Sequence, residues 1–192
     1  MSSVLAQNIE DASTLFASLD RCELQVQQAV DLITKALGSG HKLLACGNGG
    51  SAADAAHMTT EFVVRFVRDR RPYPAICLNA QGGDLTAIGN DYGFDEIFAR
   101  QVTAFAQPGD VLIAFTTSGK SANILFALEA AKRSGIKTIA FLGRDGGNCR
   151  GLADVELLVD HNITARIQEA HQLLLHTICE MFELTMGHAP ER

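Results

Sequence analysis

Two different spacings of apolar residues divide this 192-residue chain into two regions. Between residues 3 and 37 apolar positions recur every three to four residues, and neither Gly nor Pro occurs before Gly38. This spacing predicts two amphipathic helices, the second of which ends at Gly38. From residue 41 onward, short apolar runs alternate instead with segments of helix length.

The short apolar runs have the length of buried strands. They cover residues 41–46, 74–78, 110–115, 137–142 and 154–159. Helices are expected near 51–68, 94–106, 121–134 and 164–185. Strands and helices that alternate in this way are typical of βα units on a parallel sheet, so the sequence predicts an α/β fold. We expect one domain over 1–192, with a helical element at 1–38 and an α/β core at 39–192.

Composition and charge exclude several classes of protein. Hydrophobic residues make up 47% of the chain and charged residues 20%, which is ordinary for a globular protein and unlike a disordered or fibrous one. The net charge of -6 argues against a dedicated nucleic-acid binder. The basic cluster at 65–71 is interrupted by Asp69, and we interpret it as a solvated helix end or a subunit contact.

Membrane and disulfide classes are also disfavoured. No apolar run approaches the roughly 20 residues of a membrane span, and the N-terminus lacks the pattern of a signal peptide. The five cysteines are widely spaced and form no CxxC pair, so they indicate neither a disulfide framework nor a thiolate metal site. Cys46 and Cys77 lie inside apolar runs and are predicted to be small core residues. We expect a soluble, cytoplasmic protein.

Two strand-to-helix turns carry the first functional signal. Residues 47–52 read Gly-Asn-Gly-Gly-Ser-Ala, and residues 116–121 read Thr-Thr-Ser-Gly-Lys-Ser. In an open parallel sheet such turns lie at the carboxyl ends of strands, where ligands bind at the point at which strand order reverses. If the strands that precede them are neighbours, both turns face one crevice.

The second turn has the chemistry of a phosphate site. Its four hydroxyl groups belong to Thr116, Thr117, Ser118 and Ser121. Gly119 permits close approach to the backbone, and the helix that follows presents unpaired N–H groups and a positive dipole end. An ordinary N-cap is the alternative, because Ser and Thr are common there. Four hydroxyls in six residues, opposite a Gly-rich turn, favour phosphate.

A nucleotide ligand is disfavoured. Gly47, Gly49 and Ala52 formally satisfy the dinucleotide fingerprint, but no acidic residue stands at the end of the next predicted strand. The sequence also contains no complete Walker loop. A phosphorylated small molecule is therefore the better prediction.

Polar residues on two predicted helices form a third candidate group. His57 and Glu61 are four residues apart and share a helix face. On the last predicted helix, Gln168 and His176 differ by about 80° around the axis, so with Gln172 they form a polar ridge on an apolar helix. Polar side chains directed into an apolar environment need partners.

A metal ion is one partner that fits these residues. Two imidazoles, a carboxylate and an amide oxygen suit zinc, although Gln is an uncommon ligand. Hydrogen bonds between two surface helices explain the same spacing. Asp54, one turn before His57, likewise has two interpretations, as a partner that orients the imidazole or as an exposed charge on the helix face.

Five runs of sequence resemble the phosphoheptose isomerases, which are sedoheptulose 7-phosphate isomerases within the larger group of sugar-isomerase (SIS) domains. They are CGNGGS (46–51), AIGNDYGF (87–94), TTSGKS (116–121), GRDGG (143–147) and ARIQEAH (165–171). The resemblance covers residues 20–185, in order. It implies a flavodoxin-like five-stranded parallel sheet flanked by helices, and a homotetramer packed through the N-terminal helices. It also implies an active site between subunits with one zinc ion per subunit.

The resemblance implies roles for individual residues. The metal ligands correspond to His57, Glu61, Gln168 and His176. The substrate contacts correspond to Asn48, Gly49, Gly50, Glu61, Asn90, Asp91, Thr116, Thr117, Ser118, Ser121 and Gln168. We expect Glu61 to be the base at C1 and His176 the acid that completes proton transfer at C2. Some members have an Asp where this chain has Ala165, a departure that affects only an auxiliary role.

The activity implied is conversion of D-sedoheptulose 7-phosphate to D-glycero-D-manno-heptose 7-phosphate through an enediol, with zinc as a Lewis acid. This is the first step of bacterial heptose synthesis for lipopolysaccharide or other glycans. An alternative is a non-catalytic, sugar-phosphate-binding partner of the replication initiator protein. Relatives of that kind have an incomplete metal constellation at the position of Glu61, so the presence of Glu61 favours the enzyme. An isomerase for another phosphorylated sugar is a third interpretation.

Overall fold

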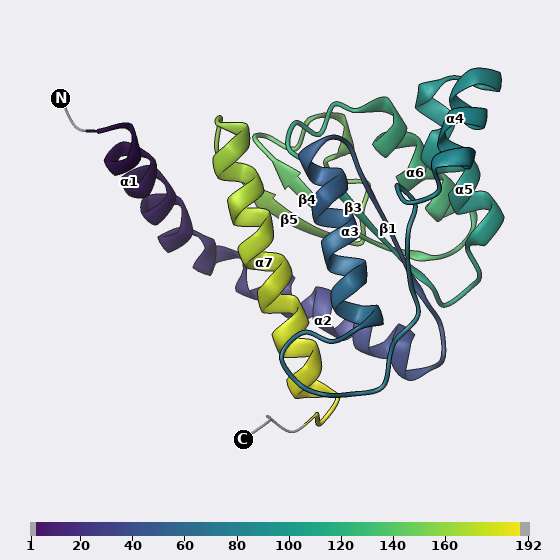
Figure 1. Cartoon of the computed structure of the whole chain (residues 1–192), viewed down its shortest axis with the longest axis horizontal. Helices are drawn as coiled ribbons and strands as arrows, with labels where there is room; N and C mark the ends of the chain where they lie inside the picture. Colours follow the sequence, from purple (N-terminus) through teal and green to yellow (C-terminus); the bar gives the residue numbers. More distant parts are fainter. Residues whose placement is uncertain (1–2, 189–192) are drawn as a thin grey trace.

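The computed structural model describes residues 3–188 and is built around a five-stranded parallel sheet (Figure 1). The strands are β1 (Leu43–Gly47), β2 (Ala75–Cys77), β3 (Val111–Thr116), β4 (Lys137–Gly143) and β5 (Val155–Val159). Their order is β2-β1-β3-β4-β5. This is the flavodoxin-like order, so the predicted fold class is confirmed. Because β1 and β3 are neighbours, the turns that follow them meet at the point where strand order reverses.

Helices cover both faces of the sheet. They are α1 (Val4–Ala17), α2 (Glu23–Gly38), α3 (Gly50–Val63), α4 (Gly82–Asp91), α5 (Ile97–Phe105), α6 (Ala122–Arg133) and α7 (Thr164–Thr185). Short 3-10 turns occur at η1 (Leu19–Cys22), η2 (Phe94–Glu96) and η3 (Gly147–Cys149). Helices α2, α3 and α7 pack on one face, whereas α4, α5 and α6 pack on the other. Helix α1 extends away from the sheet (Figure 1).

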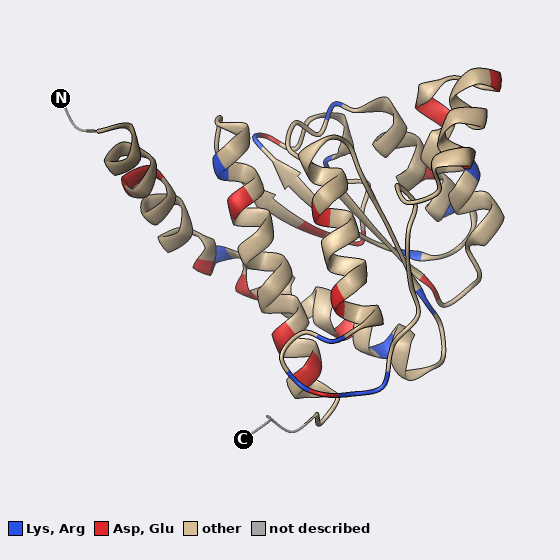
Figure 2. Cartoon of the chain, viewed as in Figure 1, with Lys and Arg blue, Asp and Glu red and all other residues tan. Residues whose placement is uncertain are grey.

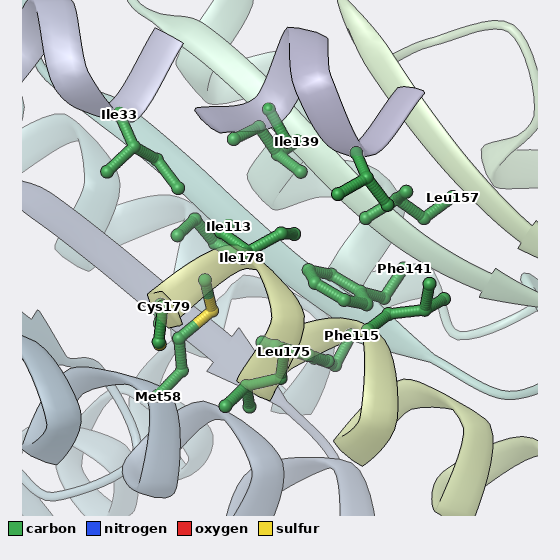
Figure 3. Close-up of a cluster of buried hydrophobic side chains, with 14 of the residues drawn as sticks. Ile33, Met58, Ile113, Phe115, Ile139, Phe141, Leu157, Leu175, Ile178 and Cys179 are labelled. Carbon is green, nitrogen blue, oxygen red and sulfur yellow. The ribbon is translucent and has the colours of Figure 1, made fainter. Parts of the chain in front are cut away.

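The core consists of two apolar clusters separated by the sheet, because successive strand side chains point to opposite faces. Ile113 and Phe115 of β3 point toward α2, α3 and α7. Leu112 and Ala114 of the same strand point toward α5 and α6. Figure 3 shows the first cluster, in which Ile178 of α7 packs with strand side chains. The long helix α7 is therefore held against the sheet along its apolar face.

The predicted elements are largely present. All five strands occur, and residues 4–38 form the two predicted helices, with the short turn η1 between them. The helix predicted over 51–68 is wrong at its end, since α3 stops at Val63 and the chain turns to run beside α7. Helix α4 is not predicted by the pattern, because it opens on Gly82 and Gly83 and buries none of its residues.

Two further features concern the apolar residues. No helix among residues 3–188 is both long enough and apolar enough to cross a membrane. All five cysteines are buried and free of disulfide bonds, and Cys46 and Cys77 belong to the core as predicted.

Candidate active site

The turn between β1 and α3 depends on its glycines and on one asparagine. A Cβ at Gly47 would collide with the backbone of Ser51, and Gly49 has a φ of +56°. Asn79, which follows β2, accepts from Gly47 N at 3.1 Å and donates to Gly47 O at 2.9 Å. These contacts hold the start of α3 close to the strand end. Asn79 is a structural residue that the sequence motifs do not identify.

Asn48 links this turn to the one that follows β3. Its side-chain amide donates to Asn123 Oδ1 at 2.8 Å, and its oxygen accepts from Asn123 Nδ2 at 2.9 Å. Asn123 lies in the first turn of α6 and is 1% exposed. The reciprocal pair therefore fixes the predicted substrate contact Asn48 over the hydroxyl-rich turn. Asn123 follows the TTSGKS run by two positions, which is the only signal in the sequence that could have found it.

The hydroxyl-rich turn encloses a small cavity at the N-terminus of α6. The cavity has a volume of about 50 Å³. Its lining residues are Asn48, Ser51, Phe115, Thr116, Thr117, Ser118 and Ser121. Pockets that hold whole ligands have volumes of roughly 300–1,000 Å³, so this cavity suits one small chemical group. The unpaired N–H groups and the dipole of α6 favour an anion there, as a phosphate site requires.

The hydroxyl groups of the turn are arranged for a ligand. Thr116 Oγ1 accepts from Gly119 N at 3.1 Å, and Ser118 Oγ accepts from Lys120 N at 3.2 Å. Because both hydroxyls act as acceptors in these bonds, their hydrogens can be donated to a phosphate oxygen. Ser121 occupies the N-cap position of α6, but its side chain makes no capping hydrogen bond. The ordinary N-cap interpretation therefore does not explain Ser121.

The GRDGG run packs against the hydroxyl-rich turn at 116–121. Gly119 has a φ of +63°, and a Cβ there would collide with the carbonyl of Gly146. Cys149 N donates to Gly119 O at 3.0 Å. The close approach of two glycine-rich loops explains why both runs need residues without side chains.

Helices α3 and α7 run side by side and bring His57, Glu61 and His176 together (Figure 1). Glu61 Oε1 lies 2.9 Å from His57 Nε2, and His176 Nε2 lies 3.4 Å from the same nitrogen. The side chains of His57 and Glu61 are 36% and 18% exposed, so a ligand can reach them. Two residues from α3 thus meet one from α7 that is more than a hundred positions away.

The charge state of His176 follows from its burial and from its contacts with His57 and Glu61. Burial lowers the pKa of His176, His57 lowers it further, and the Glu61 carboxylate raises it by less. Because an ordinary histidine has a pKa of about 6.5, His176 is neutral at pH 7. A neutral imidazole can offer a lone pair to a metal or to a proton.

Gln168 lies apart from these three residues. Its side-chain amide packs so closely against Gly50 that a Cβ at that position would collide with it. Gln168 and His176 are eight residues apart on α7, which is about 12 Å along the helix axis. The structure therefore groups three of the four predicted metal ligands, and it places Gln168 at the Gly-rich turn.

The fit of a metal ion depends on the chemistry of the three grouped side chains. Within residues 3–188, His, Cys, Asp and Glu form no ready-made group of three or more that could hold a metal ion. His57 Nε2 instead lies within hydrogen-bond distance of Glu61 Oε1 and of His176 Nε2. Two imidazole nitrogens and a carboxylate oxygen are nevertheless a donor set that zinc favours. His57, Glu61 and His176 are therefore the residues that would hold it.

Asp54 adopts neither of its two predicted roles. It is 4% exposed, and its Oδ1 accepts from Gln172 Nε2 at 2.6 Å. Burial raises the pKa of this carboxyl group, and the contributions of Gln172 and His57 only partly oppose the increase. The Asp54–Gln172 bond joins α3 to α7 between the Gly50–Gln168 contact and the histidine pair.

Other predicted residues lie away from the small cavity. Asn90 and Asp91 end α4 and are exposed, and Asn90 Nδ2 donates to Asp91 Oδ1 at 2.8 Å. Helix α4 packs against α5, on the opposite face of the sheet from α3 and α7. Ala165 is exposed in the first turn of α7.

Comparisons with known proteins identify the family of the chain. The model of the SIS domain family matches residues 6–143. A phosphoheptose isomerase of Citrifermentans bemidjiense is 51% identical over 158 residues, which are 82% of each chain. One from Bordetella avium is 48% identical over 94% of this chain and 93% of its own.

Solved structures give the same result. The phosphoheptose isomerase of Neisseria gonorrhoeae superposes with a TM-score of 0.89 and 40% identity, over 94% of this chain and 97% of its own. That of Francisella tularensis superposes with a TM-score of 0.91 and 36% identity, over 96% of this chain and 100% of its own.

Proposed function

This chain belongs to the SIS domain family and, within it, to the phosphoheptose isomerases, and from this premise we propose that it converts D-sedoheptulose 7-phosphate to D-glycero-D-manno-heptose 7-phosphate. The observation that carries the proposal is the contact of Glu61 and His176 with the same nitrogen of His57. A carboxylate and two imidazoles at one partly open position are the groups that a proton transfer between adjacent carbons requires.

The chain's own residues supply the acid and the base. Glu61 removes a proton from C1 of the ketose, which gives the enediolate form of the enediol. The proton passes from Glu61 to the neutral His176 by way of His57 Nε2, which contacts both groups. His176 then delivers it to C2, while the hydroxyl proton of O1 moves to O2, so that the carbonyl is at C1 in the product and both side chains return to their starting states. Acid–base catalysis of this kind contributes typically 10²–10⁴ in rate.

The phosphate cavity is also lined by the start of α3, and this position supports the roles proposed for Glu61 and His176. Ser51 lines the cavity and His57 lies six residues further along the helix, which is about 9 Å along the axis. A sugar phosphate that is anchored at 116–121 therefore extends along α3 toward Glu61. Asn48 and Gln168 are near the start of this path. Binding energy from the phosphate is then used to position C1 and C2.

A zinc ion is part of the proposal. His57, Glu61 and His176 would hold it, and when bound it would polarise the sugar carbonyl as a Lewis acid. The donor types support zinc. Gln168 stays a prediction as the fourth ligand, and in this structure its amide contacts Gly50.

Assembly into a homotetramer is also proposed, on the evidence of an apolar groove. The groove has a volume of about 770 Å³ and lies where α1, η1 and α2 meet α7. Apolar residues dominate its lining, among them Phe16, Leu19, Leu24, Leu173 and Met181. Helix α1 beside it exposes Val4, Leu5 and Ile9. Large exposed apolar patches mark sites of protein association.

The cellular role that follows is the first step of bacterial heptose synthesis for lipopolysaccharide or other glycans, in the cytoplasm. The similarity to phosphoheptose isomerases over nearly the whole chain supports it.

The proposal is tested by incubating the protein with sedoheptulose 7-phosphate and following the aldose by NMR. Glu61→Gln should abolish turnover and leave a folded protein, because the amide cannot accept the proton. Glu180→Gln, an exposed position on α7, is the matched control and should keep normal turnover. Near-normal activity of Glu61→Gln would refute the proposed acid–base mechanism.

A further inference from the structure

Two arginine side chains of the basic segment that follows α3 are held inside the protein. The prediction of a solvated helix end is wrong for Arg68 and Arg70, whose side chains are 9% and 1% exposed. Figure 2 shows the blue segment passing the red residues at the C-terminal end of α7. The cause is a carboxylate on α7, Glu183, which is completely buried.

Glu183 binds the backbone of this segment directly. It accepts from Phe66 N at 3.0 Å, Val67 N at 3.1 Å and Arg68 N at 2.9 Å. Arg70 Nε donates to the same carboxylate at 2.9 Å. Burial raises the pKa of Glu183, but these N–H groups and the guanidinium lower it by more, so the pKa lies below its ordinary value. The carboxylate is therefore ionised and fully bonded at neutral pH.

Arg70 extends the contact to the end of α3. Its Nη2 donates to Glu61 O at 2.6 Å, and its Nη1 donates to Phe62 O at 3.0 Å. The last carbonyls of a helix have no partners within the helix. Arg70 supplies a partner to Glu61 O, and it shares Phe62 O with Tyr73 N, which donates to the same oxygen at 3.0 Å. The backbone of Glu61 is thus fixed by the residue that pairs with Glu183.

Phe66 extends the contact to His176. Its ring stacks on the imidazole, with centroids 5.4 Å apart and planes at 29°. Its N–H donates to Glu183, which lies seven residues after His176 on the same side of α7. The buried Arg70–Glu183 pair therefore holds both the backbone of Glu61 and the residue whose ring packs on His176.

We propose that Arg70 and Glu183 are positioning residues that set the relative placement of Glu61 and His176. The inference rests on the proposed roles of those two residues in catalysis. A buried ion pair often adds little stability compared with apolar residues of the same volume, but its bonds are directional. The rigid guanidinium fork is suited to holding several oxygens at once. Displacing reacting groups by about 1 Å can cost on the order of 10² in rate.

Three variants separate the parts of this arrangement. Arg70→Lys keeps the charge but loses the fork that joins two carbonyls to Glu183. Glu183→Gln keeps the shape but loses the charge. Phe66→Leu removes the ring on His176 and leaves the N–H that binds Glu183. Each should lower kcat by about 10- to 100-fold. KM for the sugar phosphate should be nearly unchanged, because the phosphate turn belongs to β3 and α6.

Asp110→Asn is the matched structural control. Asp110 is 1% exposed, accepts from Lys42 N and Gln107 N, and pairs with the Lys42 ammonium. It lies at the amino ends of β1 and β3, opposite the turns. Asp110→Asn should lower the melting temperature without lowering kcat, when every variant is assayed well below its own transition.

A second readout follows the ring of His176 by NMR. Its imidazole proton shifts should move in Phe66→Leu and Glu183→Gln, and should not move in Asp110→Asn. Normal kcat in folded Glu183→Gln and in Phe66→Leu would overturn the positioning role. If Glu183→Gln does not fold, normal kcat in both Arg70→Lys and Phe66→Leu would overturn the positioning role. Full activity of Glu61→Gln would instead refute the proposed function, on which this inference depends.

Discussion

The side-chain amides of Asn48 and Asn123 donate to one another, at 2.8 and 2.9 Å, across the crevice between the β1–α3 turn and α6. The two residues are 75 positions apart in the chain. Their bonds hold the two ligand-facing turns in register, so the cavity at 116–121 keeps one shape before substrate arrives.

Replacing Asn123 by Ala should therefore weaken substrate binding. The change removes both bonds and leaves the amide of Asn48 without its partner, at a cost of about 1–3 kcal/mol in the free energy of unfolding. We expect KM for sedoheptulose 7-phosphate to rise about tenfold or more, which corresponds to roughly 1.4 kcal/mol of lost binding. Steady-state kinetics and urea unfolding measure the two effects. Gln101→Ala, a buried amide bonded to Ile97 O, is the control that should leave KM unchanged.

Ser121→Ala should raise KM without destabilising the helix it precedes. Because Ser121 makes no side-chain capping bond, the loss of stability should be within about 0.5 kcal/mol. Ser3→Ala is the contrast, since Ser3 Oγ accepts from Ala6 N and its loss should cost about 1 kcal/mol. Ser118→Ala combined with Ser121→Ala should raise KM further. An unchanged KM in that double variant would show that phosphate binds elsewhere.

Removing zinc should remove activity. Elemental analysis of the purified protein should give about one zinc per chain, and dialysis against a chelator should abolish turnover until zinc is returned. His57→Ala should lower the bound zinc because it deletes the nitrogen that contacts both Glu61 and His176. His161→Ala, which follows β5, should bind zinc normally. A metal-free protein with full activity would contradict the zinc proposal.

The stability of the protein should fall below pH 6.5 because of His171. This residue is completely buried against Phe115 and Phe141, and burial lowers its pKa to about 4 despite a hydrogen bond to Leu142 O. Between the ordinary pKa of about 6.5 and this value, the unfolded chain binds a proton that the folded chain does not. The free energy of unfolding should therefore decrease as pH falls, by about 2 kcal/mol from pH 7 to pH 5.

His171→Leu is the variant that checks this dependence. It removes the titration, so its unfolding free energy should change less between pH 7 and pH 5 than that of the native chain. Both are measured by urea unfolding at one protein concentration. An equal loss in the two proteins would assign the effect to other groups.

Leu24→Glu should disrupt the proposed tetramer. Leu24 is 65% exposed and lines the apolar groove next to α7, so a carboxylate there would be buried in a subunit contact that covers this groove. Analytical ultracentrifugation should show a smaller species with unchanged helix content. Val64→Glu, at the exposed end of α3 and outside the groove, serves as the comparison. A tetramer that survives Leu24→Glu would exclude this groove as its interface.

The sequence alone determined the sheet and the chemistry of its turns. Buried strands appear as short apolar runs, and a parallel sheet brings the ends of those runs to one edge. The sequence therefore placed Asn48 beside Thr116 and Ser121 on the condition that β1 and β3 are neighbours, which the strand order confirms. The polar ridge on α7 was equally visible, because a helix repeats every 3.6 residues.

Only the tertiary structure decided which partner each ridge residue meets. Gln168 contacts Gly50, Gln172 binds Asp54 and His176 joins His57, although all three occupy one face. Helical periodicity identifies a face, but the register between two helices more than a hundred residues apart depends on how both pack on the sheet. The same packing buried Arg70 with Glu183 and ended α3 at Val63, where the composition had indicated a solvated helix end.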